Sequence, residues 1–434
     1  MNPTSAHAEN VLLIVLIQLI VIVLSSRVFG YFFRKIGQPT VCGEIAAGLV
    51  LGPSLFGRFF PEISHQIFDP SVSQTFSIFS QIGLILLMFL IGLEFDFDHL
   101  KTNRGTAFSV SLIGIILPFT LGFALGHWMH GALNLSGSWL NFALFMAVAM
   151  SITAIPVLGR IVMELNIGRT RIGSLTISAA ALDDATGWIL LASITALVRS
   201  TLDPVKLALM VAETIGFVAG MIWIVRPLLK KWVRRVMESS KGVTLDFLAV
   251  LLVFIMLAAI ATNLIGIFAV FGAFFFGAVL YDETAFREAI QERLRDFVTV
   301  FFLPIFFTYT GLRTDLGTMS GATLWFMCGL VLAAAILGKL GGCTLAARIN
   351  GVSWRESFLI GTMMNTRGLM ELIVVNMGYE LGIIPRSVFF MLVLMAVVTT
   401  YMTTPLLRRY IHSTEMEAPF LKSRFYALDS KALR

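Results

Sequence analysis

Long apolar stretches recur from one end of the chain to the other, separated by short polar segments. About 18 or more apolar residues in a row are enough to cross a membrane as a helix, and the two-residue alternation of a membrane β-barrel is not evident. The pattern predicts an all-α polytopic membrane protein with about thirteen transmembrane helices. The expected spans are 11–29, 40–54, 75–94, 106–126, 140–162, 171–198, 207–226, 245–264, 267–281, 296–312, 321–342, 357–377 and 387–407.

Composition agrees with this fold class. Of the 434 residues, 57% are hydrophobic and 13% are charged, whereas soluble domains carry about 25% charged residues. The net charge of +6 does not indicate a nucleic-acid partner, because basic residues of membrane proteins collect in cytoplasmic loops. Most of the 32 lysines and arginines fall in alternate loops, which predicts an external N-terminus, a cytoplasmic C-terminus and a location in the plasma (inner) membrane.

The sequence gives little indication of disulfide bonds, a zinc site or nucleotide binding. The three cysteines form no CxxC pair, so neither a disulfide framework nor a zinc site is expected. The segment 411–434 is read as a short cytoplasmic tail without a GxGxxG nucleotide-binding fingerprint. We therefore expect no cofactor and no bound metal other than a monovalent cation.

Two predicted spans contain residues that interrupt a helix. In 140–162, Pro156 follows Ser151, Thr153 and Ala154, and a proline inside a helix removes a backbone donor. In 357–377, Asn365, Thr366 and Gly368 cluster at mid-span. Pro156 alone could be an ordinary kink, but two interrupted spans in matching positions are typical of a transporter site. The two spans are seven apart, which favours an inverted repeat that pairs spans 4–6 with spans 11–13.

Seven charged residues lie more than two positions inside the predicted spans, and two of them, Asp183 and Asp184, are adjacent. A charge at the bilayer centre costs about 3 kcal/mol on insertion scales, so such residues indicate a site that handles protons or cations. The others are Glu44, Glu213, Lys339, Arg367 and Glu371. Arg367 and Glu371 stand four residues apart on one helix face, where a structural ion pair is favoured over contact with a substrate.

Lys339 has no acidic residue three or four positions away on its own helix. It therefore needs a partner elsewhere, and an ion pair with one of the two aspartates is the simplest solution, although it could also reach out of the membrane. Neighbouring helical residues point about 100° apart, so the aspartates have separate roles: one faces Lys339 and the other faces the broken helices. Asp184, Thr153 and the carbonyls of the unwound segment could hold a hard monovalent cation, which would compete there with a proton.

Six motifs along the chain point to one protein family. They are GQPTVCGEIAAGLVLGPS at 37–54, LMFLIGLEFD at 87–96, SITAIPVLGRIVMEL at 151–165, SAAALDD at 178–184, GKLGG at 338–342 and NTRGLMELIVVNMG at 365–378. In these motifs the chain resembles the monovalent cation:proton antiporter-2 family, over essentially all of its spans. The resemblance implies a homodimer of subunits with an NhaA-like inverted repeat and two discontinuous crossing helices. It also implies that Asp184 is the essential ion-binding carboxylate and that Asp183 is its variable partner.

The resemblance further implies one transmembrane antiporter domain over 1–410. A core within 106–198 and 321–407 would move like an elevator against a dimerisation scaffold within 11–94 and 245–312, with 207–226 as connector. The predicted activity is exchange of Na⁺, K⁺ or Li⁺ for H⁺ in pH and cation homeostasis, without enzymatic chemistry.

Other classes of function fit less well. DDATG is superficially similar to the Asp-rich Mg²⁺ motifs of prenyl-transferring enzymes, but position 187 is Gly where a further acid is needed. A sensor built on a transporter fold would need a signalling domain, which is not visible. A channel and an organic-anion symporter remain, and two buried carboxylates disfavour the symporter.

Overall fold

Every regular element that the computed structural model describes is helical, as the apolar pattern predicts. The described residues are 3–38, 40–68, 73–94, 104–168, 170–199, 204–238 and 243–423, so the end of the predicted tail lies outside them. Nine of the described helices are long and apolar enough to cross a membrane, and Trp139–Ser151 and Ala269–Ala278 are shorter apolar helices. The chain is therefore a multi-pass membrane protein.

The predicted number of thirteen spans is not confirmed. Nine predicted spans match the nine long helices, and the remaining four correspond to short or interrupted helices, at 40–54, 140–162, 267–281 and 357–377. Two long helices extend well beyond their apolar stretch: one continues past 226 to Met237, and another begins at Thr284 rather than at 296. Hydropathy marks where the apolar stretch ends, whereas the helix continues as an amphipathic segment.

The chain divides into two compact units. The first comprises Met1–Val23, His65–Asp98 and Leu191–Tyr309, and the second comprises Leu24–Ser64, His99–Leu190 and Thr310–Arg434. Four helices contribute to both units, namely α1 (Pro3–Lys35), α4 (Pro61–Ile67), α9 (Arg171–Arg199) and α15 (Leu303–Leu312). Residues 24–64 fall in the same unit as most of 106–198 and 321–407. The division into a moving core and a scaffold stays a prediction.

In the first unit, α13 packs against α5 and against α12. Gly92 and Gly277 allow the first of these contacts, because a side chain at either position would overlap the backbone of the other helix. The helices of this unit are α5 (Ser73–Glu94), α10 (Pro204–Gly220), η3 (Met221–Val225), α11 (Arg226–Met237), α12 (Leu245–Ile265), α13 (Ala269–Ala278), α14 (Thr284–Phe297), η4 (Val298–Phe302) and α15 (Leu303–Leu312).

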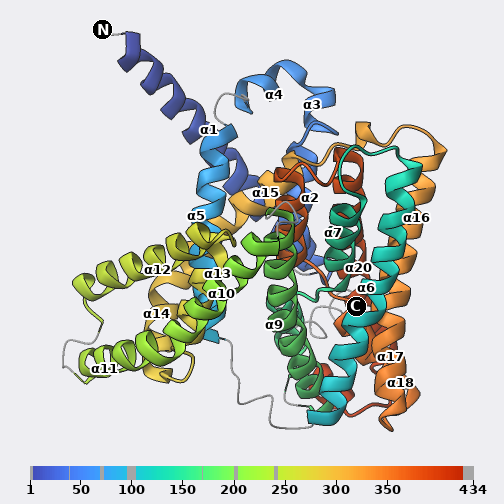
Figure 1. The fold of residues 1–434 in the computed structure, drawn as a ribbon. Coiled ribbons are helices and arrows are strands. Elements are labelled where there is room, and N and C mark those ends of the chain that lie inside the picture. The colour runs from blue at the N-terminus through green and yellow to red at the C-terminus, as the bar shows by residue number, and fades with distance from the viewer. Residues whose placement is uncertain are drawn as a thin grey trace. The chain divides into compact units, whose positions relative to one another are not determined.

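In the second unit, α6 packs against α7 and along the helix formed by α16, η6 and α17 (Figure 1). The helices of this unit are α2 (Thr40–Leu51), α3 (Phe56–Phe59), α4 (Pro61–Ile67), α6 (Arg104–Ala132), α7 (Trp139–Ser151), α8 (Ile155–Glu164), η5 (Leu316–Thr318), α16 (Ala322–Ile336), η6 (Leu337–Gly341), α17 (Gly342–Ile349), α18 (Trp354–Met364), α19 (Leu369–Glu380), α20 (Arg386–Tyr410) and α21 (Glu417–Leu421). The larger part of α9 belongs here as well.

The second unit contains the same succession of elements twice. A long helix is followed by an interrupted pair and then by another long helix, first as α6, α7–α8 and α9, and again as α16–α17, α18–α19 and α20. This is the pairing of spans 4–6 with spans 11–13 that the sequence predicts. The inverted orientation of the two halves and their movement as a core stay predictions.

Candidate functional site

The first interruption separates α7 from α8. Helix α7 begins after Ser138, whose hydroxyl accepts a hydrogen bond from the Asn141 N–H, and it ends at Ser151. Residues 152–154 are not helical, and α8 then starts at Ile155. Pro156 lies in the first turn of α8, where its missing N–H leaves no helical bond unmade. The proline therefore marks the start of a second helix rather than a kink in one.

The second interruption separates α18 from α19. Helix α18 begins after Ser353, whose hydroxyl accepts a hydrogen bond from the Glu356 N–H and contacts the Glu356 carboxylate, and it ends at Met364. Gly368 precedes α19 with φ of 155°, a conformation that side chains disfavour, and a Cβ there would lie 2.9 Å from Cγ2 of Val157. Glycine is thus required both by the backbone and by the contact with α8.

The two interruptions contact each other directly. The Ala154 N–H donates to the carbonyl of Thr366 across 3.1 Å. The Thr153 hydroxyl lies 2.9 Å from the carbonyl of Met364, the last residue of α18. Non-helical backbone at membrane depth needs such partners, because no water is available to replace them.

Helix α20 supports the second interruption from its other side. The Thr400 hydroxyl accepts a hydrogen bond from the Arg367 N–H at 2.9 Å and donates to the Arg367 carbonyl at 2.6 Å. The hydroxyls of Thr366 and Thr403 are 3.3 Å apart. The Asn365 amide contacts Met402 through its nitrogen, while its oxygen is buried without a hydrogen-bond partner among the described residues.

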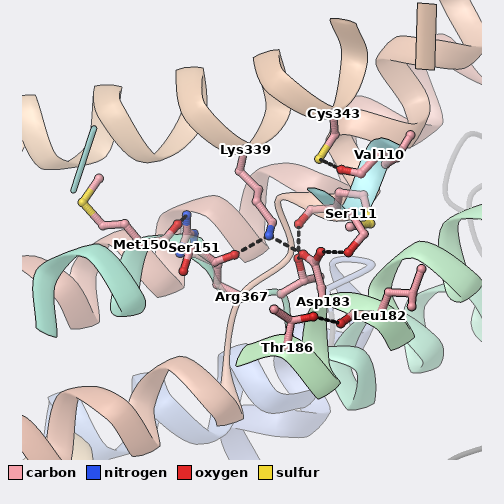
Figure 2. A network of polar contacts seen from close by, with 12 residues as sticks. Val110, Ser111, Met150, Ser151, Leu182, Asp183, Thr186, Lys339, Cys343 and Arg367 are labelled. Atoms are coloured by element: carbon pink, nitrogen blue, oxygen red, sulfur yellow. Dashed lines mark hydrogen bonds and ion pairs between the residues drawn. The ribbon is translucent and has the colours of Figure 1, made fainter. Parts of the chain in front are cut away.

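Asp183 is the centre of a buried polar network (Figure 2). The Ser111 hydroxyl donates to its Oδ1 at 2.7 Å, and the Thr153 hydroxyl lies 2.8 Å from its Oδ2. The Lys339 ammonium forms an ion pair with the same Oδ2 and also donates to the carbonyl of Ser151. Asp183, Lys339 and Thr153 are all fully buried, and a buried charge needs such partners to be tolerated.

Lys339 reaches this network from η6, a π-helical turn between α16 and α17. A single turn of π-helix inside an α-helix occurs frequently at functional sites. The structure thus brings together the lysine and aspartate that the sequence pairs by elimination. In Figure 2 the lysine side chain extends from its helix to both Asp183 and Ser151.

Asp184 has a different environment. It is fully buried, and neither carboxylate oxygen has a hydrogen-bond donor in standard geometry among the described residues. The indole of Trp188, one turn further along α9, faces this carboxylate. Gly187, three residues from Asp184, packs on Ile152 of the first interruption, where a Cβ would lie 3.0 Å from Cγ1. The two aspartates are therefore separated in role, as their spacing on the helix predicts.

Arg367 binds the carbonyl end of α7. Its two terminal nitrogens donate to the carbonyls of Ala149 at 2.9 Å and Met150 at 2.6 Å, and the ion pair with Glu371 is longer, at 3.7 Å. The last carbonyls of a helix lack partners and carry partial negative charge, which cations stabilise. Together with Lys339 on Ser151, the end of α7 is thus neutralised by two cations.

The sequence did not indicate three features of this site. Ser111 is one of several small polar residues in an apolar span, and Thr400 is one of a run of threonines, so neither stands out. Thr153 is paired with Asp183 in the structure, whereas the sequence placed it with Asp184. Among the described residues, no group of three or more His, Cys, Asp or Glu could hold a metal ion.

Comparison with known proteins gives the family. Residues 20–409 match the family described as sodium/hydrogen exchanger, transmembrane. The chain is 38% identical over 403 residues to the Na⁺/H⁺ antiporter NhaS4 of Synechocystis, which covers 92% of this chain and 97% of that protein. It is 37% identical over 398 residues to cation/H⁺ antiporter 17 of Arabidopsis thaliana, which covers 92% of this chain and 48% of the plant protein.

Two further matches extend the comparison. The K⁺/H⁺ antiporter 1 of Saccharomyces cerevisiae is 31% identical over 418 residues, with 93% of this chain and 47% of that protein covered. The chain thus spans about half the length of the plant and yeast relatives. The structure of MjNhaP1 from Methanocaldococcus jannaschii at pH 8 superposes with a TM-score of 0.66 and 16% identity, covering 95% of this chain and 99% of that chain, a likeness in fold.

These matches confirm the resemblance expected from the motifs at 151–165, 178–184 and 365–378. The family consists of membrane transporters, so the chain is not an enzyme. Because the family match covers most of the sequence, the chain belongs to the sodium/hydrogen exchanger family of transmembrane proteins.

Proposed function

We propose that this protein is a secondary antiporter that exchanges a monovalent cation for H⁺ across the membrane. The observation that carries the proposal is the Asp184 carboxylate, which is fully buried beside the contact of two interrupted helices and has no hydrogen bond in standard geometry among the described residues. A buried carboxylate without such bonds must take up a proton or a cation to be stable. The Synechocystis and yeast relatives, named as a Na⁺/H⁺ and a K⁺/H⁺ antiporter, support the same activity.

In this proposal the proton and the cation occupy Asp184 in turn. A cation that reaches the site replaces the proton, and the proton leaves to the side of the membrane that is open. The empty carboxylate does not cross, because an unpaired charge in a low-dielectric core is unfavourable by several kcal/mol. Obligate exchange follows from this exclusion alone.

Asp183 and Lys339 act as a coupled pair beside the carrier carboxylate. Their ion pair holds the end of α7 through Ser151 and fixes α9 against the first interruption. Thr153 links this pair to α18, because its hydroxyl lies 2.8 Å from Asp183 and 2.9 Å from the Met364 carbonyl. One hydroxyl proton can be donated to only one of these oxygens at a time, so the Met364 carbonyl is available as a cation ligand when Thr153 donates to Asp183.

Movement of the core gives the site access to each side in turn. We propose the elevator mode for 106–198 and 321–407 against the scaffold, in a homodimer located in the plasma (inner) membrane with an external N-terminus and a cytoplasmic C-terminus. The basic residues of alternate loops support this orientation. The physiological role would be pH and cation homeostasis, with Na⁺, K⁺ or Li⁺ as the exchanged ion.

The test uses purified protein in proteoliposomes with an imposed pH gradient and an internal pH dye. Addition of Na⁺, K⁺ or Li⁺ should dissipate the gradient, and Asp184→Asn should abolish the response. Glu213→Gln is the matched control, since Glu213 is an exposed acidic residue of α10 outside the network, and it should exchange like the parent. No response to any of the three cations between pH 6 and 9, or full activity of Asp184→Asn, would refute the proposal.

A further inference from the structure

The least buried of the long apolar helices continues into a basic segment. Helix α10, the π-helical turn η3 and α11 follow one another without a break from Pro204 to Met237. Of the most apolar stretch of this helix only 6% is buried, against 22% to 67% in the other eight long helices of the described chain. Its large apolar side chains are exposed, with Trp223 at 77% and Ile224 at 63%. This surface faces lipid in a membrane protein.

Helix α11 is amphipathic, and its apolar side packs against the rest of the unit. Leu229 and Val233 are buried, and the Trp232 ring stacks on Phe247 of α12 with 4.3 Å between ring centroids. The opposite side forms an open cavity of about 520 Å³. It is lined by Pro227, Lys230, Lys231, Arg234, Arg235 and Glu238.

Two acidic residues that follow α13 neutralise part of this charge. Asp282 pairs with Lys230 and, at 3.1 Å, with Arg226. Burial raises the pKa of the Asp282 carboxyl, but Lys230 and Arg226 lower it by more, so the pKa lies below its usual value and the carboxylate stays charged. Glu283 pairs with Arg234 at 2.7 Å.

An excess of positive charge remains in the cavity. Lys231 and Arg235 form no ion pair with any residue in the described part of the chain, and Glu238 is the one further acidic side chain that lines the cavity. Lys231 and Arg235 stand four residues apart, so both lie on one face of α11 and can contact a single anion. The neighbouring Lys230 and Arg234 bind Asp282 and Glu283, which leaves Lys231 and Arg235 as the basic side chains of the cavity without an ion pair among the described residues.

We propose that this cavity binds the phosphate headgroup of an anionic glycerophospholipid. Lys231 and Arg235 contact the phosphate, and the acyl chains lie along the exposed apolar surface of η3, over Ile222, Trp223 and Ile224. Continuity between the basic cavity and the lipid-facing surface selects a lipid over a free phosphate, which would use only the charged part. Clusters of Lys and Arg next to a transmembrane helix attract anionic lipids in this way. The inference does not depend on antiport.

The test measures binding of phosphatidylglycerol and phosphatidylcholine to the full-length protein in detergent by native mass spectrometry. The parent should prefer phosphatidylglycerol, and Lys231→Gln/Arg235→Gln should bind it about thirty-fold more weakly, as expected for the loss of two basic side chains near the headgroup. The control Arg293→Gln/Arg295→Gln removes the same charge from α14 and should bind within about threefold of the parent.

Three results would overturn the proposal. The first is an equal loss of binding in the control variant, which would indicate unspecific attraction. The second is a rise in melting temperature with inorganic phosphate that matches the rise with phosphatidylglycerol. The third is unchanged phosphatidylglycerol binding together with a changed oligomeric state in Lys231→Gln/Arg235→Gln, which would assign the surface to a second copy of the chain. Should the double variant not fold, Lys231→Gln alone should bind about fivefold more weakly, and binding within twofold of the parent would refute the site.

Discussion

Replacement of Lys339 by methionine tests the buried network most simply, because it removes the ammonium and keeps most of the side-chain volume. The change deletes the ion pair with Asp183 and the hydrogen bond to the Ser151 carbonyl. Removal of one partner of a buried ion pair usually costs about 3–5 kcal/mol. Asp183 keeps its contacts with Ser111 and Thr153, so the lower end of this range applies.

The expected loss follows from this range. Lys339→Met should be less stable than the parent by about 3–4 kcal/mol, because the Asp183 charge stays buried without its cation.

The assay is thermal unfolding in detergent at pH 7, followed by tryptophan fluorescence. At about 1 °C per kcal/mol for a chain of this size, the melting temperature of Lys339→Met should fall by about 3–4 °C. The double variant Lys339→Met/Asp183→Asn should recover most of the loss, since no unpaired charge remains. Lys422→Met, at an exposed position, should melt like the parent.

Two results would refute this reasoning. A melting temperature of Lys339→Met within about 1 °C of the parent would mean that the substitution leaves no buried charge unpaired. A double variant that is less stable than Lys339→Met would mean that Asp183 is stabilised by contacts other than the lysine.

Two further predictions concern the interrupted helices. Gly368→Ala should reduce exchange strongly and destabilise the protein by about 1–3 kcal/mol, because φ of 155° is unfavourable with a side chain and the new Cβ would lie 2.9 Å from Val157. The control is Gly216→Ala, at a helical position with open space. Parent-like melting and transport of Gly368→Ala would contradict this account of the second interruption. Thr153→Val keeps the shape and removes the hydroxyl, so it should weaken apparent cation affinity at least several-fold and lower the melting temperature by about 1–3 °C, whereas Thr153→Ser should stay near the parent. Equal behaviour of the two variants in transport assays would exclude a role for the hydroxyl.

Much of the fold and part of the site could be predicted from the sequence. Both interruptions are visible because proline and glycine change the backbone locally, and Lys339 could be paired with an aspartate because a buried charge without a partner on its own helix needs one elsewhere. Both features depend on single residues and on spacing along one helix, so they can be predicted without knowledge of how the helices pack.

The rest depends on packing between helices. The contact of Arg367 with the carbonyls of Ala149 and Met150 joins residues more than 200 positions apart, and helical spacing favours the weaker contact with Glu371. The placement of Thr153 against Asp183 depends on the rotation of α9 about its axis, which sequence spacing does not set. The extent of α11 was missed for another reason, because an amphipathic continuation of a span has the composition of a loop.

The central claim is that cation and proton compete for one carboxylate, and its most direct test is the apparent KM for the cation as a function of pH in proteoliposomes. Competition predicts that the apparent KM rises about tenfold for each unit of falling pH on the acid side, while the maximal rate at saturating cation stays constant. An apparent KM that does not change with pH, with a maximal rate that falls instead, would contradict a shared site at Asp184.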